Sequence, residues 1–157
     1  NVKDELLKGK TIGDKTYKVH LDGYNMLPYL TGEEKEGRRK ELFYFSDDGE
    51  LMALRYNDWK ITFMKQNETG TMLTWSTPME TMRTPTIYNL RRDPYEFATV
   101  TSNTYWDWWL DHVFLLLPAT EYVGEFLGTF KEYPPRMKSE TFNLSQVMEQ
   151  LTTPTSN

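Results

Sequence analysis

The strongest constraint on the fold is a run of alternating residues in the first half of the chain. "ELFYFS" is separated from "ELMALRY" by Asp47-Asp48-Gly49, and Asn57-Asp58 then leads into "WKITFMK". Asp-Gly and Asn-containing pairs favour tight turns, because Gly and Asn readily adopt a positive φ. Trp59, Ile61 and Phe63 share one face of the third segment. The pattern predicts a three-stranded antiparallel meander.

Further elements follow this meander. "TMLTW" (71–75) and "TIYNL" (86–90) are each predicted to add a strand, and 15–21 is predicted to be an edge strand. The last third is predicted to be helical over 104–117, ending at Pro118, and again over 119–133 and 143–151. In the first of these helices, apolar residues recur at helical spacing and are expected to face the core: Trp106, Trp109, Leu110, Val113, Phe114 and Leu117.

The order of these elements defines an α+β fold class. We predict an antiparallel sheet of about four strands, arranged as a hairpin meander, with amphipathic helices packed on one face. Residues 1–151 are expected to form a single domain, and 152–157 are expected to be a disordered tail.

Composition excludes several classes of function. The net charge of −5 disfavours a nucleic-acid partner, because phosphate binding requires a basic face. Mean hydropathy is −0.68 and we find no run of about 18 apolar residues, so no membrane span is expected. The sequence has no Cys, which excludes thiol nucleophiles and Cys-ligated zinc.

Few residues are candidates for chemistry. The two histidines, His20 and His112, have no nucleophile motif near them and are interpreted as structural. Asp47-Asp48 lacks the spacing of a calcium loop and is interpreted as a turn. Aromatic side chains that lie on an exposed surface can stack on a sugar. The predicted ligand-surface aromatics are Trp108, which lies off the apolar stripe, Tyr105 and Trp75.

The joint order of several short motifs resembles the C-terminal region of bacterial arylsulfatases, in the sulfatase family of the alkaline-phosphatase-like superfamily. "HLDGYNMLPYLTG" is followed by "RKELFYFSDDGELMALRYNDWKITF" and then by "IYNLRRDPYE". The ending "NTYWDWWLDH…EYVGEFLGTFKEYPPR" is similar to one arylsulfatase subgroup. The matching positions are Asp22-Gly23, Leu30-Thr31-Gly32, Ala53, Arg55, Trp59-Lys60, Leu90, Asp93-Pro94 and Glu96.

The resemblance implies chemistry that this chain does not carry. The family uses calcium and a formylglycine made from the first residue of a C/S-x-P/A-x-R motif. Here the single Ser-x-Pro run is Ser76-Thr77-Pro78, and Glu80 stands in the place of the required Arg. We therefore assign no catalytic, cofactor-binding or metal residue to this chain. The motif residues are interpreted as architecture, with Asp93 capping a turn.

Three functions follow as expectations. The first is the C-terminal subdomain of an arylsulfatase, which packs on a sulfatase catalytic domain normally on the same polypeptide, shapes the substrate entrance and is inactive alone. The second is a stand-alone module that binds a carbohydrate or a sulfated glycan. The third is a protein-interaction module that self-associates through an exposed docking face. The resemblance gives no compartment for this chain, although the bacterial family is often periplasmic or secreted.

Overall fold

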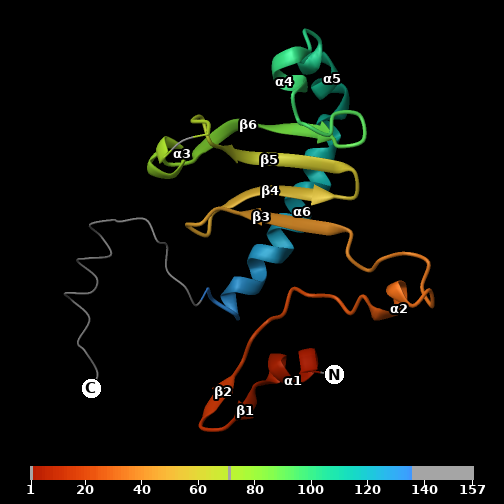
Figure 1. Cartoon of the computed structure of the whole chain (residues 1–157), viewed down its shortest axis with the longest axis vertical. Helices are drawn as coiled ribbons and strands as arrows, with labels where there is room; N and C mark the ends of the chain where they lie inside the picture. The colour runs from red at the N-terminus through yellow and green to blue at the C-terminus, as the bar shows by residue number, and fades with distance from the viewer. Residues whose placement is uncertain (1, 71, 136–157) are drawn as a thin grey trace, which may run out of the picture.

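The centre of the protein is a four-stranded antiparallel sheet with the strand order β3-β4-β5-β6 (Figure 1). The structure is a computed structural model, and it describes residues 2–70 and 72–135. The strands are β3 (Glu41–Phe45), β4 (Leu51–Tyr56), β5 (Trp59–Lys65) and β6 (Glu80–Asn89). Neighbours in the sheet are neighbours in sequence, so the predicted meander and the α+β fold class are confirmed.

The two tight turns use the backbone conformations that the sequence predicts. Gly49 has a φ of 80° between β3 and β4, and Asn57 has a φ of 52° between β4 and β5. The second turn is also tied to both edge strands. The Asn57 N–H donates to the Lys40 carbonyl at 2.9 Å, and the Leu90 N–H donates to the Asp58 carbonyl at 2.7 Å. These bonds fix the end of the β4–β5 hairpin.

One continuous helical stretch crosses a single face of the sheet (Figure 1). It consists of α5 (Tyr105–His112), the 3₁₀ turn η1 (Val113–Leu115), α6 (Leu116–Gly128) and the 3₁₀ turn η2 (Thr129–Lys131). The prediction that Pro118 ends a helix is wrong. Pro118 lies in the first turn of α6, where a missing N–H costs no intrahelical hydrogen bond.

The core forms where α6 meets the middle of the sheet. Leu54, Ile61, Ile87 and Ala119 are buried against one another. Half-buried side chains surround this cluster: Phe43, Trp59, Phe63, Trp108, Trp109, Leu115, Leu116, Tyr122 and Val123. The predicted inward face of β5 is therefore confirmed.

The predicted core face of the first helix is largely wrong. Of its six residues, only Trp109 packs against the core, and the other five are exposed. Trp108, predicted to lie off the core stripe, packs against the core instead. The helix carries apolar side chains on both sides, so helical spacing alone does not select the inner one. Hydrogen bonds from Tyr105 and Trp109 to the backbone of β6 make that selection.

The segment before the sheet contributes no buried side chain. It contains α1 (Val2–Lys8), the short strands β1 (Lys10–Ile12) and β2 (Lys15–Tyr17), which pair in a separate sheet, and α2 (Leu27–Leu30). The strand predicted over 15–21 is thus shorter than expected. No residue from 2 to 40 is buried. Contacts such as the ion pair between Lys18 and Glu132 at 2.8 Å hold this segment to the end of the helical stretch.

One further prediction is wrong, and two predictions near the C-terminus cannot be compared with the structure. The strand predicted over 71–75 is wrong, because Met72–Ser76 forms the short helix α3. The Gln66 side-chain amide donates to the carbonyls of Thr74 and Thr77 at 2.8 and 2.7 Å and so holds this helical turn. The short helix α4 (Ala98–Thr101) precedes α5. The helix predicted over 143–151 and the tail 152–157 lie outside the described residues.

The stretch Tyr105–Lys131 is long and apolar enough, by length and composition alone, to cross a membrane. Its most apolar 18-residue window has a mean hydropathy of 1.2. A single helix of this kind is weak evidence, because core helices of water-soluble proteins meet the same criterion. The expectation of no membrane span therefore stays a prediction.

The central packing makes a prediction about stability. Leu54 is 1% exposed at the contact between the sheet and α6, whereas Leu30 is 75% exposed on α2. We expect Leu54→Ala to lower the free energy of unfolding by about 2–5 kcal/mol, because it removes buried methyl groups and leaves a cavity. Leu30→Ala, the matched control, should change it by less than about 0.5 kcal/mol. Urea unfolding followed by circular dichroism measures both, and equal effects would contradict this core assignment.

Candidate functional site

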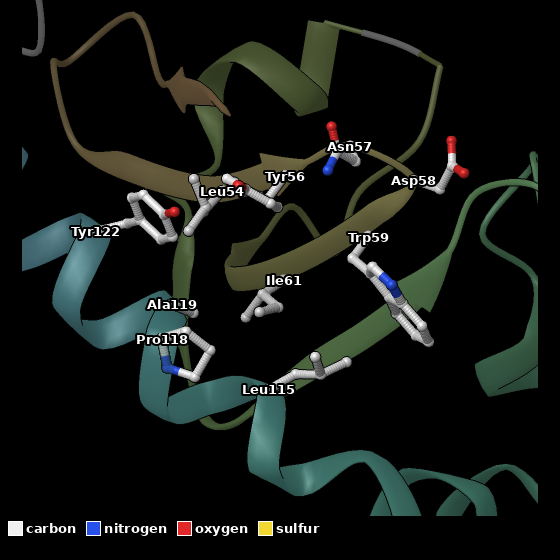
Figure 2. Close-up of a pocket in the computed structure, with 10 residues that line it drawn as sticks. All are labelled: Leu54, Tyr56, Asn57, Asp58, Trp59, Ile61, Leu115, Pro118, Ala119 and Tyr122. Carbon is white, nitrogen blue, oxygen red and sulfur yellow. The ribbon is translucent and has the colours of Figure 1, made fainter. Parts of the chain in front are cut away.

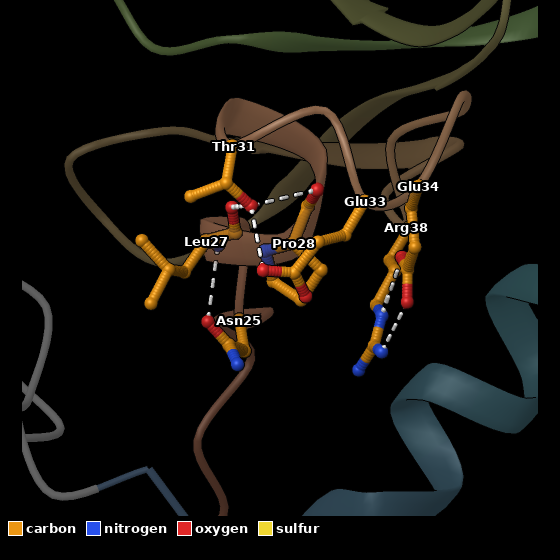
Figure 3. A network of polar contacts seen from close by, with 7 residues as sticks. All are labelled: Asn25, Leu27, Pro28, Thr31, Glu33, Glu34 and Arg38. Atoms are coloured by element: carbon orange, nitrogen blue, oxygen red, sulfur yellow. Dashed lines mark hydrogen bonds and ion pairs between the residues drawn. The ribbon is translucent and has the colours of Figure 1, made fainter.

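The "HLDGYNMLPYLTG" motif forms a small self-contained hydrogen-bond network around α2 (Figure 3). The Asn25 side-chain oxygen accepts the Leu27 N–H at 3.1 Å. The Thr31 hydroxyl lies 3.0 Å from the Leu27 carbonyl and 3.1 Å from a Glu33 carboxylate oxygen, which it can reach as a donor. Gly32 follows with a φ of 80°, in the left-handed region that closes a helical turn. The motif builds a turn.

A bidentate ion pair completes this network. The Arg38 guanidinium donates to both oxygens of Glu34, at 3.0 and 2.6 Å (Figure 3). The hydrogen bond lowers the pKa of Glu34 and raises the pKa of Arg38. Both side chains are largely exposed, so the pair contributes little to stability and chiefly fixes the path of the loop.

The Lys-containing strand motif meets the "DPYE" corner on the sheet face opposite α6. Lys60 donates to both carboxylate oxygens of Glu96, at 2.7 and 2.8 Å, and its ammonium lies 5.0 Å from the centre of the Tyr44 ring. Glu96 has a φ of 59°, which a non-glycine residue rarely adopts. The ion pair and this backbone conformation together bring the corner onto the sheet.

The same corner is closed by a side-chain cap. The two Asp93 carboxylate oxygens accept the N–H groups of Phe97 and Ala98, at 3.0 and 2.8 Å. These groups lie at the start of α4, where backbone donors have no helical partner. The capping role predicted for Asp93 is confirmed, and the corner residues serve architecture.

A cavity of about 520 Å³ lies between the β4–β5 hairpin and the helical stretch (Figure 2). Its walls are mostly apolar, and its size falls within the range of small-molecule sites. The hairpin supplies one side and the start of α6 the other. The lining residues are Leu54, Tyr56, Asn57, Asp58, Trp59, Ile61, Leu115, Pro118, Ala119 and Tyr122.

Polar groups of this cavity come from its tyrosines and its turn. The rings of Tyr56 and Tyr122 lie 4.9 Å apart, and the hydrogen bond with Tyr56 raises the pKa of Tyr122 to about 12. Asp58 lies 3.4 Å from the guanidinium of Arg91. The apolar walls can hold a flat apolar group, and neutral phenols and an amide can hydrogen-bond its polar substituents. They supply no strong nucleophile, so the arrangement favours binding rather than bond cleavage.

The structure separates the three predicted ligand-surface aromatics. Tyr105 is 2% exposed, and its hydroxyl accepts the Ile87 N–H and donates to the Ile87 carbonyl, each at 3.0 Å. Trp108 stacks on His112 at 4.2 Å between ring centres and packs against the core. Trp75 alone of the three is widely exposed, at 73%. Tyr105 is therefore unavailable as a surface residue, because it fastens α5 to β6.

The other candidate residues occupy structural positions. The Nδ1 atom of His112 lies 2.7 Å from the Trp108 carbonyl, and that of His20 lies 2.9 Å from an Asp22 carboxylate oxygen. Asp47-Asp48 lies in the β3–β4 turn, as predicted. Within residues 2–70 and 72–135, no group of three or more His, Asp or Glu side chains converges as metal ligands would. The cavity of Figure 2 was missed by the sequence analysis, because it depends on how α6 crosses the sheet.

Comparison with protein families identifies the class of this chain. Residues 37–156 match the family described as the C-terminal region of aryl-sulfatase. The match covers more than half of the chain, so the chain belongs to this family. Residues 1–36, which include α1 to α2 and all residues labelled in Figure 3 except Arg38, lie before the matched region.

Comparison with individual proteins adds one sulfatase. The chain is similar to the PsFucS1 sulfatase from Pseudoalteromonas sp., with 28% sequence identity and a TM-score of 0.45. The similarity covers 63% of this chain and 19% of that chain, so it concerns a small part of the PsFucS1 sulfatase. No curated protein matches this chain.

The hydrogen bonds between Tyr105 and Ile87 lead to a prediction about how stability depends on pH. Burial raises the pKa of Tyr105 to about 12, well above the value of about 10 in an unfolded chain. The folded state therefore favours the neutral phenol. The stability that the neutral phenol contributes to the folded state is fully present below pH 10 and is lost as the pH rises toward 12.

We expect Tyr105→Phe to lower the free energy of unfolding at pH 7 by about 1–3 kcal/mol, since it leaves the Ile87 backbone groups unpaired. The variant should also lose less stability than the unchanged protein between pH 9 and pH 11. Tyr95→Phe, at a ring 78% exposed, is the control and should leave both quantities unchanged. Identical alkaline unfolding of the Tyr105 variant and the unchanged protein would contradict the role of this phenol.

Proposed function

We propose that this chain is the supporting C-terminal subdomain of an arylsulfatase, which packs on the catalytic region of the same enzyme and is inactive alone. The observation that carries the proposal is the family match over residues 37–156. Motif residues within this region hold a corner against the sheet, as the Lys60–Glu96 pair and the Asp93 cap illustrate. The reactive groups of a sulfuric ester hydrolase would come from the catalytic region.

The proposal includes a contribution to the substrate entrance. The cavity of Figure 2 opens beside the β4–β5 turn, where Asn57 and Asp58 are rigidly held by backbone hydrogen bonds. An aryl group is flat and apolar, which suits walls of Trp, Tyr and Leu. In the whole enzyme this turn would line the path by which the aryl part of a sulfate ester reaches the catalytic groups.

The alternative of a glycan-binding module has less support. Stacking on a sugar requires an exposed aromatic surface, and of the three predicted aromatics only Trp75 offers one. Tyr105 and Trp108 are committed to the contact between the helix and the sheet.

Enzyme assays test the first part of the proposal. We expect this chain alone to hydrolyse no 4-nitrophenyl sulfate, and the longer arylsulfatase chain that carries it to do so. A longer chain cut before residue 37 should lose activity, because its catalytic region lacks support. Turnover by this chain alone, or full activity of the shortened enzyme, would overturn the proposal.

Kinetics of the longer enzyme test the entrance. We expect Asp58→Ala to raise KM for aryl sulfates by about threefold or more with kcat nearly unchanged, since it alters the approach and leaves the reacting groups in place. Asp14→Ala, in the β1–β2 turn, is the control and should change neither constant. A fall in kcat with unchanged KM would count against an entrance at this turn.

A further inference from the structure

The outer side of the helical stretch carries a regular set of exposed apolar side chains. Trp106, Leu110, Val113, Phe114 and Leu117 recur at intervals of three and four residues and share one side of the helix. Their exposed fractions are 54%, 63%, 40%, 59% and 76%. We call these five residues the outer stripe.

The outer stripe makes this helix apolar on two sides. The inner side packs on the sheet through residues such as Trp109, Leu115 and Ala119. A helix that is apolar nearly all round is typical of an element enclosed by a larger protein or by a membrane. All five side chains of the outer stripe are exposed, so the described part of this chain supplies no partner for them.

Charges beside the stripe indicate what that partner is. Residues 105–131 contain four carboxylates, Asp107, Asp111, Glu121 and Glu125, against a single lysine, Lys131. Asp107 and Asp111, which lie four residues apart in α5, follow the same border of the stripe. Among the described residues, none of these four acids forms an ion pair. A complementary surface is apolar and has Lys or Arg along one border.

We propose that the outer stripe is the surface through which this region docks on the catalytic region of its own sulfatase. The docking surface of that region is apolar with a basic border. This assignment rests on the proposed function and adds to it the face that makes the contact. A catalytic region on the same polypeptide is present at high effective concentration, so a modest apolar contact is enough to hold it.

The same charges disfavour a membrane surface and a second copy of this chain as the partner of the outer stripe. Helices that lie on membrane surfaces carry Lys and Arg on their polar side, and anionic lipids repel carboxylates. A second copy of this chain would bring the same patch to a symmetric contact, and each copy has a net charge of −5. Both cases place like charges near one another.

Cysteine accessibility tests the docking face, because this chain contains no Cys. Leu110→Cys and Leu117→Cys report on the outer stripe. Met72→Cys on α3 is the control, since Met72 is 74% exposed and Leu117 is 76% exposed. Each variant is made in this chain alone and in the longer sulfatase chain. Labelling by a maleimide is then followed at each site by peptide mass spectrometry.

We expect both stripe positions to react about tenfold or more slowly in the longer chain than in this chain alone, while the control changes by less than about twofold. Equal rates at the stripe would overturn the docking assignment. Protection in this chain alone that grows with protein concentration would overturn it in favour of a second copy. Protection by phosphatidylglycerol vesicles would overturn it in favour of a membrane.

A charge substitution gives an independent readout. Leu110→Glu should lower the melting temperature of the longer chain and leave that of this chain alone unchanged, because its surroundings differ only when docked. An equal fall in both would overturn the assignment. The two proposals fail separately, since turnover of an aryl sulfate by this chain alone refutes the proposed function. Unprotected stripe positions in an enzyme that needs this region for activity refute only the docking face.

Discussion

The contact between α6 and the middle of the sheet determines the rest of the structure. Ala119 is the α6 residue of the buried cluster, where it meets Leu54, Ile61 and Ile87. Its small side chain lets the helix approach the sheet closely, so the larger rings beside it, Trp109 and Tyr122, fill the margins. The cavity and the exposed outer stripe both follow from how this helix lies on the sheet.

The motif residues of the matched region fix local geometry through hydrogen bonds and an ion pair. Asp93 caps a short helix, and Lys60 fixes a corner through Glu96. Thr31 and Asn25, which lie before the region that matches the family, shape the loop that precedes the sheet. Few residue types can replace them, because each corner needs a particular hydrogen-bond donor or acceptor. The order of such residues along the chain indicated the family, which the match over residues 37–156 confirms.

The sequence predicted the sheet well because its signals are local. Alternation and the turns at Gly49 and Asn57 depend on a few neighbouring residues, and the structure confirms them. The orientation of the helix was mispredicted, because Trp106 and Trp108 are equally apolar. The choice between them depends on hydrogen bonds to a strand some 20 residues earlier in the chain. The cavity arises from that same long-range contact, so no local sequence pattern predicts it.

The way α5 meets β6 has a consequence for assembly. β6 ends the sheet, and an end strand normally offers unpaired backbone groups to any other strand. Here the Tyr105 hydroxyl occupies both groups of Ile87, and the Trp109 indole N–H occupies the carbonyl of Pro85, which itself has no N–H to offer. At Pro85 and Ile87 the rim of the sheet is therefore closed to β-augmentation.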